Sequence, residues 1–431
     1  MTHVAMLSLH TSPLDQPGIG DGGGLNVYVR ELASALARSG VTCDVFTRAT
    51  SGNSPDVITV EPGFRVFNIK AGPLRPLSRF EFIEFLEEIT NMVIKCIIDN
   101  DNDYDEPISA IHANYWLSAL VGHSIKHQLE IPLITTFHTL EKVKIAQKQG
   151  DLDLVMSQKR IEAESIITAC SDAVIASCEA EVNDLLTFYG LEMARSAIIA
   201  PGVEKAFFQK GKKTFAKVAL EMYLRVNYPH LLNCPIADNP LVLFVGRMQP
   251  LKGIDVAVGM LAMLEEYGIE NAKLLAVGGP SGIGSQEWYL ELKSLVKDAG
   301  MGNDIIFLPP QQHEVLATFY RAADCVIVPS KSESFGLVAL EAMACAIPVV
   351  AANVGGLTTL ITSGKDGFLV DGHDSSAYAS AVSEILANNS LARYISINAI
   401  DKASKYTWQN AARRLNYVYK GVAQKKIIQA C

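Results

Sequence analysis

Short apolar segments alternate with longer amphipathic ones along this chain of 431 residues, in two successive series. This alternation is typical of β-α-β units, whose strands pair in parallel. The first series predicts strands at 4–9, 41–46, 65–69, 110–113, 133–136, 173–176 and 197–199, and helices at 26–39, 80–99, 116–128 and 158–168. The second predicts strands at 241–245, 273–277, 305–308, 325–328, 348–351 and 367–370, and helices at 254–266 and 287–299. We therefore expect an α/β protein with two parallel sheets.

A Pro-Gly pair at 201–202 separates the two series, and turns of this composition interrupt regular structure. The chain is long enough for each series to bury its own core. We expect a first domain at residues 1–201 and a second domain that begins at residue 202. Residues 407–419 predict a last amphipathic helix within a final segment, 406–431.

Composition and charge exclude several classes of protein. The formal charge of −9 argues against a chain that grips nucleic acid broadly, and the absence of a long uncharged apolar run argues against a membrane span. The apolar stretch 4–9 is too short for a signal peptide and has no basic leader. The eight cysteines are scattered without a Cys-x-x-Cys pair, which favours a reducing cytoplasm. We identify no metal-ligand cluster, since His10, His112 and His138 lie in separate segments, so we expect no required metal, although a peripheral Mg²⁺ is compatible with this reading.

Two glutamates stand eight residues apart in a segment that joins an apolar strand to a helix. Glu333 lies in a Ser- and Gly-containing turn, and Glu341 lies in the helix that begins near Gly336. A helix start offers unpaired N–H groups to phosphate, and carboxylates accept hydrogen bonds from hydroxyl groups. The pattern indicates a nucleotide-sugar site. The alternative is that Glu333 caps the helix and Glu341 lies on a solvated face.

A second strand-to-helix turn carries Arg247 and Lys252, which could hold one diphosphate from two sides. Because both turns follow strands of one predicted sheet, they should meet at its carboxyl edge, where open α/β sheets bind ligands. A third turn contains Gly278 and Gly279, and it either contacts the ligand or is only a tight turn. Its spacing lacks the G-x-G-x-x-G pattern expected of a dinucleotide-binding oxidoreductase.

The amino-terminal loop, residues 10–26, is polar and rich in glycine, and a helix opens near Gly24. Glycines let the backbone fold around a small ligand, and the helix start presents N–H groups to phosphate. We interpret this loop as a binding loop, against the alternative of a flexible surface loop. His138 follows the predicted strand 133–136 and either hydrogen-bonds a sugar hydroxyl or is satisfied within its own loop.

The Glu-x7-Glu segment and the Arg247/Lys252 turn resemble those of the family 4 retaining glycosyltransferases, which have the GT-B fold. That resemblance implies two Rossmann-like domains whose sheets face a central cleft. It further implies that the last helix crosses back to the first domain, so that the second domain spans residues 202–405. It also implies that Glu333 reaches the transferred sugar, that Glu341 binds the ribose, and that Arg247 and Lys252 hold the diphosphate. The catalytic residues would be His138, Arg247, Lys252 and Glu333.

The amino-terminal loop is similar to that of the glycosyltransferases that open mycothiol biosynthesis, through His-Thr-Ser-Pro-Leu and Gly-Asp-x-Gly-Gly-x-Asn-Val-Tyr. These enzymes move N-acetylglucosamine from UDP-N-acetylglucosamine to 1D-myo-inositol 3-phosphate. The donor-binding residues would be His10, Gln16, Pro17, Gly24, Arg247, Lys252, Gln311, Glu333 and Glu341. The acceptor-binding residues would be Asp21, Gly22, Gly23, Gly24, Asn26, Arg79, Tyr115, Thr139 and Arg160.

The chain departs from the family at two of these site positions and at one further position. Position 79 usually holds lysine, position 311 often holds arginine, and Ala346 stands where a helix C-cap glycine is usual. We expect small-molecule substrates and a cytoplasmic location, and a homodimer is compatible with the sequence. The alternatives are another family 4 enzyme (sucrose-synthase-like, or a mannosyltransferase), a nucleotide-binding oxidoreductase, and a non-catalytic nucleotide-sugar sensor.

Overall fold

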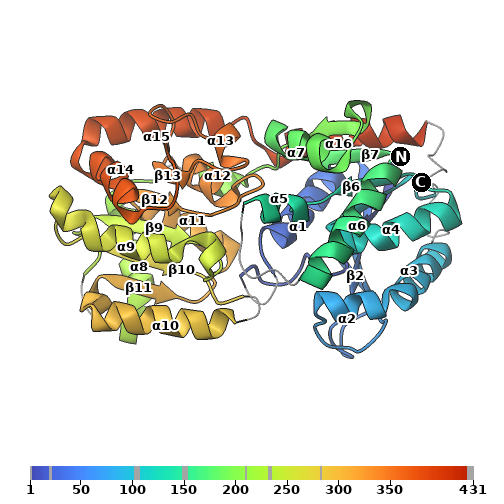
Figure 1. Ribbon diagram of the computed structural model, residues 1–431, viewed down its shortest axis with the longest axis horizontal. Coiled ribbons are helices and arrows are strands. Elements are labelled where there is room, and N and C mark those ends of the chain that lie inside the picture. The colour runs from blue at the N-terminus through green and yellow to red at the C-terminus, as the bar shows by residue number, and fades with distance from the viewer. Residues whose placement is uncertain are drawn as a thin grey trace. The chain divides into compact units, whose positions relative to one another are not determined.

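The computed structural model describes residues 2–18, 22–100, 107–147, 154–208, 211–231, 235–281 and 284–424. The chain divides into two compact units (Figure 1). Unit 1 comprises Met1–Asp15, Gly24–Gly202 and Trp408–Cys431, and unit 2 comprises Gln16–Gly23 and Val203–Thr407. None of the helices in the described ranges combines the length and the apolar character needed to cross a bilayer.

Unit 1 is built on an eight-stranded sheet with the order β3-β4-β2-β1-β5-β6-β7-β8. All neighbouring strands are parallel except β3, which pairs with β4 in the antiparallel sense. The strands are β1 (Thr2–Leu7), β2 (Val41–Arg48), β3 (Val57–Glu61), β4 (Phe64–Ile69), β5 (Ala110–Asn114), β6 (Leu133–Thr136), β7 (Ala173–Ala176) and β8 (Ser196–Ile198).

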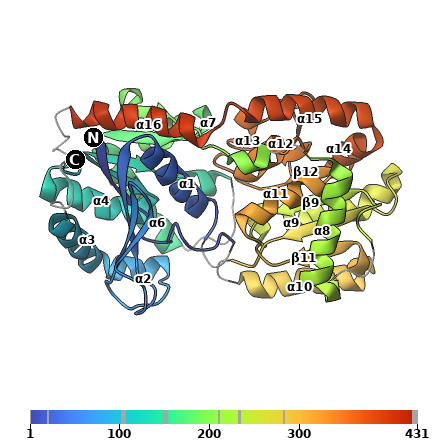
Figure 2. The same cartoon turned by 180° about the vertical axis from the view of Figure 1, so that it is seen from behind.

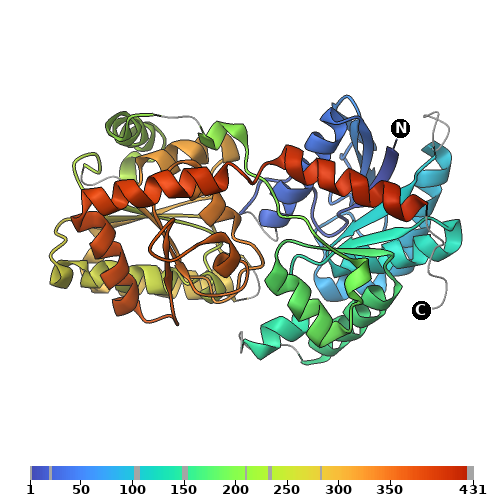
Figure 3. The same cartoon turned by 90° about the horizontal axis from the view of Figure 1, so that it is seen from above.

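Helices cover both faces of this sheet, as its buried strands require. Alternate residues of β1 point to opposite faces: Ala5 and Leu7 pack in a cluster with α3, α4 and α6, whereas Val4 and Met6 pack with α1 and α16. Figures 2 and 3 show α1 and the red C-terminal helix α16 lying on unit 1. The helices are α1 (Gly24–Arg38), α2 (Arg79–Glu84), α3 (Leu86–Asn100), α4 (Trp116–Leu129), α5 (Glu141–Ala146), α6 (Leu154–Cys170), α7 (Glu179–Tyr189) and α16 (Trp408–Ala423).

Unit 2 contains a six-stranded, entirely parallel sheet with the order β11-β10-β9-β12-β13-β14. The strands are β9 (Leu241–Val245), β10 (Lys273–Val277), β11 (Ile305–Leu308), β12 (Cys325–Val328), β13 (Val349–Ala352) and β14 (Phe368–Val370). The helices are α8 (Lys213–Asn227), α9 (Ile254–Met263), α10 (Ser285–Asp298), α11 (His313–Ala322), α12 (Leu337–Ala344), α13 (Leu357–Leu360), α14 (Ser375–Ala387) and α15 (Asn389–Ala403). Apolar residues of β9 and β10 pack with α9 and α14 to form one core.

The structure departs from the predicted elements at several places. The predicted helix 80–99 is two helices, because Phe85 leaves helical geometry with φ −101° and ψ 10°. Strand β1 ends at Leu7, and the backbone N–H of Leu9 donates to Ser118 Oγ at 3.0 Å. Strand β3 was not predicted, since it lies at the sheet edge and its residues are only partly buried.

The predicted domains and the observed units differ in one informative segment. The main division falls between residues 202 and 203, and the last helix belongs to unit 1, but residues 16–23 group with unit 2. The Pro-Gly pair at 201–202 predicts that segment to lie in the first domain. It carries Gln16 and Pro17, two of the predicted donor-binding residues. The cleft implied by the family resemblance stays a prediction.

Candidate active site

The predicted ligand-binding residues of unit 2 lie where the strand order of its sheet reverses. The neighbours β9 and β12 connect onward in opposite directions, to β10 on one side and to β13 on the other. Arg247 and Lys252 follow β9, and Glu333 follows β12. Ligands of open α/β sheets bind at this switch point, outside the carboxyl ends of the strands.

Lys252 and Glu333 form an ion pair there, with Lys252 Nζ 2.7 Å from Glu333 Oε2. Both side chains are about a fifth exposed, so they remain accessible to a ligand. Gly253 fixes the approach of the two turns: its φ is +72°, and a Cβ at this position would lie 2.2 Å from the carbonyl oxygen of Pro329. Only glycine permits this backbone contact without strain.

Arg247 faces the glycine-containing turn that follows β10. Its Nη1 donates to Ser281 Oγ at 3.5 Å, and the N–H of Met248 donates to Gly279 O at 2.8 Å. Gly278 has φ +151°, and a Cβ there would lie 1.8 Å from the carbonyl oxygen of Gly246. Close packing of two turns therefore accounts for the glycine at 278, one of the two readings that the sequence left open.

Glu341 is buried at 7% exposure, so the alternative that it lies on a solvated face is wrong. Its Oε1 is 2.8 Å from His313 Nε2, and its Oε2 accepts a hydrogen bond of 2.6 Å from the hydroxyl of Tyr320. The other ring nitrogen of His313 lies 2.7 Å from Glu204 Oε1. Burial lowers the pKa of His313, but the two carboxylates outweigh it and raise the pKa to about 10. A cationic histidine between two carboxylates thus fixes Glu341.

Sequence reasoning missed His313 and Tyr320. Both lie on α11, 28 and 21 residues before Glu341, and no spacing pattern connects them to it. Only the packing of α11 beside α12 brings them together.

Gln16 and Gln311 meet as the prediction for the donor side requires. Gln16 Nε2 donates to the backbone oxygen of Gln311 at 2.7 Å, and a Cβ on Gly18 would contact Pro310. The side chain of Gln311 is occupied elsewhere: its Oε1 accepts from Tyr223 at 2.8 Å, and its Nε2 lies 3.0 Å from the hydroxyl of Tyr228. Gln311 thus presents its backbone oxygen to Gln16 of the loop segment, and contact of Pro17 with a donor stays a prediction.

The rest of the amino-terminal loop is held by internal contacts. Asn26, a predicted acceptor ligand, is buried and donates its side-chain N–H to the carbonyl oxygen of Ser12. The N–H of Gly18 donates to Gly22 O at 3.0 Å, and Gly24 is the first residue of α1 after Gly23. Asp21 lies outside the described residues. These contacts give Asn26 a structural role in shaping the loop, while its contact with an acceptor stays a prediction.

The switch point of the unit 1 sheet is formed by β1 and β5, and it gathers the other predicted residues. His10 follows β1, and its ring lies 5.9 Å from that of Tyr115, which follows β5. Tyr115 and His138 both have positive φ, 75° and 62°. Non-glycine residues in this region carry strain that is often found at functional sites.

His138 is partly buried beside Tyr28, and its Nε2 lies 3.0 Å from Asn114 Oδ1. Burial lowers the pKa of His138 to about 3, so its imidazole is neutral at physiological pH. A neutral ring can donate one hydrogen bond and accept another, which suits contact with a sugar hydroxyl. It is a weak proton acceptor, so a general-base role is unfavourable.

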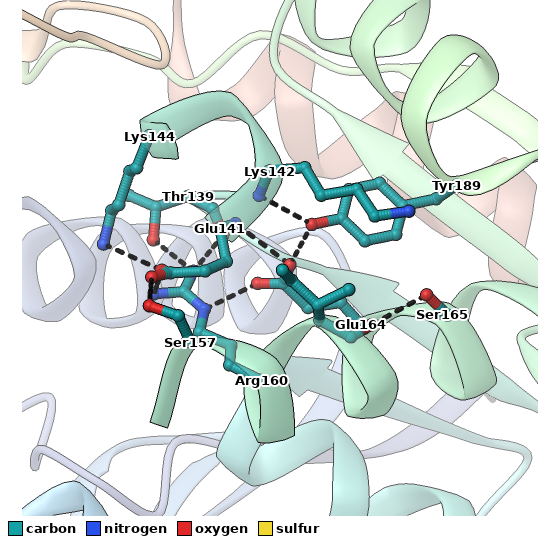
Figure 4. Close-up of polar contacts among 10 residues, drawn as sticks. Thr139, Glu141, Lys142, Lys144, Ser157, Arg160, Glu164, Ser165 and Tyr189 are labelled. Atoms are coloured by element: carbon teal, nitrogen blue, oxygen red, sulfur yellow. Dashed lines mark hydrogen bonds and ion pairs between the residues drawn. The ribbon is translucent and has the colours of Figure 1, made fainter. Parts of the chain in front are cut away.

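Arg160 is the centre of a buried polar cluster on α5 and α6 (Figure 4). Its Nε donates to Glu164 Oε1 at 2.6 Å, and its Nη2 donates to Thr139 O at 2.6 Å and to Thr139 Oγ1 at 3.0 Å. The guanidinium also lies 5.2 Å from the ring centre of Tyr115. Three of the predicted phosphate ligands, Tyr115, Thr139 and Arg160, are therefore in contact. Arg79, the fourth, is an exposed residue at the start of α2.

A histidine and cysteine group lies apart from this site. Nitrogens of His123 and His127 and the sulfur of Cys170 all lie within 4.8 Å of one another, although no metal-ligand cluster is predicted there. The fold brings α6 beside α4, which sequence spacing cannot reveal. Cys170 is disulfide-bonded, so its sulfur is not a thiolate ligand in this structure. The described free cysteines are Cys43, Cys96, Cys178, Cys325 and Cys345.

Known sequence families match both units. The family described as Glycosyltransferase Family 4 matches residues 22–207, and that described as Glycosyl transferases group 1 matches residues 235–402. Among solved structures, sucrose-phosphate synthase from Thermosynechococcus elongatus is similar with a TM-score of 0.84 and 32% identity, covering 98% of this chain and 99% of that one. The two units and their sites define a GT-B glycosyltransferase.

Full-length relatives narrow the class further. The chain is 41% identical to the D-inositol 3-phosphate glycosyltransferase of Acidothermus cellulolyticus, covering 97% of this chain and 90% of that protein. It is 38% identical to that of Corynebacterium diphtheriae, covering 99% and 96%. The chain belongs to the family of the D-inositol 3-phosphate glycosyltransferases and is a hexosyltransferase. The interpretations as an oxidoreductase and as a non-catalytic sensor are set aside.

Proposed function

We propose that this enzyme transfers N-acetylglucosamine from UDP-N-acetylglucosamine to 1D-myo-inositol 3-phosphate, with retention of the anomeric configuration, as the first step of mycothiol biosynthesis. The names of its full-length relatives support the acceptor. The Lys252–Glu333 ion pair of 2.7 Å at the switch point of unit 2 is the observation that carries the donor role.

On the donor side, Lys252 and Arg247 would stabilise the negative charge that develops on the departing diphosphate. Glu333 would exchange its lysine partner for a hydroxyl of the transferred sugar. Glu341, already fixed by His313 and Tyr320, would accept hydrogen bonds from the ribose through lone pairs that these partners leave available.

On the acceptor side, Arg79, Tyr115, Thr139 and Arg160 would bind the phosphate of the inositol, since two cations and two hydroxyls suit an anion of this size. No nucleophilic side chain is required. The incoming hydroxyl attacks the anomeric carbon on the face from which the diphosphate leaves, and the leaving diphosphate oxygen takes up the hydroxyl proton. The protein then contributes positioning and charge stabilisation.

The test is to incubate the enzyme with several nucleotide sugars, with and without inositol 3-phosphate, and to identify the products by mass. We expect an N-acetylglucosaminyl inositol phosphate and an equal amount of UDP, and anomeric proton couplings should show retention. Lys252→Met should lose turnover, whereas Lys365→Met, at an exposed position, should not. UDP release that is independent of the inositol phosphate would contradict the acceptor assignment.

A sucrose-phosphate-forming activity is the second candidate, because the similar solved structure is a sucrose-phosphate synthase with 32% identity to this chain. Reactions with UDP-glucose and fructose 6-phosphate distinguish it in the same experiment. The cytoplasmic location, the homodimer and the peripheral Mg²⁺ stay predictions. Activity that survives chelation by EDTA would support chemistry without a required metal.

A further inference from the structure

Arg160, one of the predicted phosphate ligands, already donates hydrogen bonds to other residues of the protein. Its side chain is 1% exposed, and its Nε and Nη2 donate to Glu164 and Thr139. Its Nη1 lies 3.1 Å from Glu141 Oε2 as an ion pair, but it makes no hydrogen bond within the described residues. With a carboxylate on each side, much of the positive charge of the guanidinium is offset within the protein, so Arg160 contributes less charge to an acceptor phosphate than an unpaired cation would. Its structural contribution is to hold Thr139 in place.

The carboxylate of Glu164 also accepts several hydrogen bonds within the protein. It is 0% exposed, and besides Arg160 its carboxylate accepts the backbone N–H of Glu141 at 3.0 Å and the hydroxyl of Tyr189. These partners saturate the carboxylate and fix the start of α5 against α6. The pair Arg160–Glu164 is thus a rigid base under the predicted phosphate site (Figure 4).

Lys144 is the more exposed of the two cations beside Glu141, and it keeps donors for a ligand. It lies on α5 one turn after Glu141, and Figure 4 shows its ammonium group directed at the same carboxylate as Arg160. Among the described residues its one ion pair is with Glu141, at a long 3.9 Å, and its side chain is 21% exposed. An ammonium group has three donors, of which this contact uses at most one.

We propose that Lys144 is a further acceptor-binding residue, which supplies the charge that holds the acceptor phosphate beside Thr139 and Tyr115. This inference rests on the proposed function, and it assigns Arg160 chiefly to positioning Thr139. Glu141, bound to Ser157 Oγ at 2.7 Å, is the internal counter-ion that a phosphate would replace as the partner of Lys144.

The charged groups around Lys144 make its ionisation sensitive to a bound anion. They are Arg160 and Glu164 of α6, Glu141 of α5 and Arg79 of α2. Burial first, and then the positive charge of Arg160 with a further effect of Arg79, lower the pKa of Lys144 to about 7. A dianionic phosphate would raise that pKa again, so binding of the acceptor should take up a proton above neutral pH.

The experiment compares Lys144→Met and Lys144→Arg with the wild type, and Lys142→Met serves as the matched control. Lys142 lies on the same helix, but its Nζ donates to the carbonyl oxygen of Phe188 at 2.6 Å. We expect Lys144→Met to raise the KM for inositol 3-phosphate about ten- to a hundredfold, with a smaller effect on kcat, because a charged hydrogen bond is lost. The control should leave KM unchanged.

The pH dependence separates binding from structural damage. The wild-type KM should rise above pH 7, whereas Lys144→Arg should show a flatter profile, since arginine stays charged. Calorimetry with inositol 3-phosphate alone, in two buffers of different ionisation enthalpy, should show proton uptake at pH 8 in the wild type. Equal KM values for wild type and Lys144→Met, or identical pH profiles for wild type and Lys144→Arg, would overturn the role of Lys144.

The same measurements keep the two proposals apart. A wild type that transfers sugar to inositol 3-phosphate while Lys144→Met binds it equally well refutes only the role of Lys144. A wild type that neither binds nor glycosylates inositol 3-phosphate, although it uses another acceptor, refutes the proposed acceptor and the role of Lys144 together.

Discussion

His313 offers a sharp test of how the donor-side carboxylate is held. It bridges Glu204 and Glu341 at 2.7 and 2.8 Å, with its side chain 17% exposed. Its pKa rises from 6.5 to about 10 in the folded protein, because the two carboxylates outweigh the opposing effect of burial. At about 1.4 kcal/mol for each tenfold change in proton affinity, the charged bridge contributes at most about 5 kcal/mol to the free energy of unfolding.

The sign of the pH dependence follows from the raised pKa. The stabilisation is complete below pH 6.5, where the unfolded histidine is also protonated, and it is lost as the pH rises towards 10. Replacing the histidine by glutamine (His313→Gln) removes the charge. The variant should be about 3–5 kcal/mol less stable than the wild type at pH 6 and about 1 kcal/mol less stable at pH 10.

Urea denaturation of both proteins at pH 6, 8 and 10 measures this difference, and the other titrating groups cancel in the comparison. His230→Gln is the matched control, because His230 is exposed and its replacement should cost less than about 0.5 kcal/mol at every pH. NMR of labelled histidine should show a His313 ring that is still protonated at pH 8. A ring that titrates below pH 7, or a stability difference that is equal at pH 6 and pH 10, would refute the reasoning.

Three further substitutions test the site and the fold by denaturation measurements. Tyr320→Phe removes the 2.6 Å hydrogen bond to Glu341 and should lower the free energy of unfolding by about 1.5–3 kcal/mol. Tyr378→Phe is the control, because the Tyr378 hydroxyl makes only a 3.4 Å contact, and it should cost less than about 1 kcal/mol. Equal losses of stability in the two variants would contradict this prediction. Ala346→Gly relieves a positive φ of 58° and should stabilise the protein by up to about 1 kcal/mol, and a loss of stability would disagree. Gly253→Ala forces a Cβ against the carbonyl that follows β12 and should cost more than about 2 kcal/mol and reduce turnover, so a fully active, stable variant would disprove the close approach.

Local sequence signals determined the two α/β series and much of the site. Strand β12, the turn with Glu333 and the start of α12 were predicted because apolar runs, turn residues and a helical pattern occur in immediate succession. The left-handed φ of Ala346, one residue after the C-cap Cys345 of α12, agrees with the family resemblance, in which this position usually holds glycine. Each of these features is decided within a few residues of the chain.

Only the tertiary structure decided which residues far apart in the sequence contact the same carboxylate or lie close enough for their charges to interact. His313 and Tyr320 reach Glu341 because α11 packs beside α12, and Lys144 meets the partners of Arg160 because α5 packs on α6. No local pattern encodes these contacts, since they depend on how separate helices pack on a common sheet. The sequence therefore determines where the chemistry can occur, and the packing of helices determines which side chains are charged, fixed or available for a ligand.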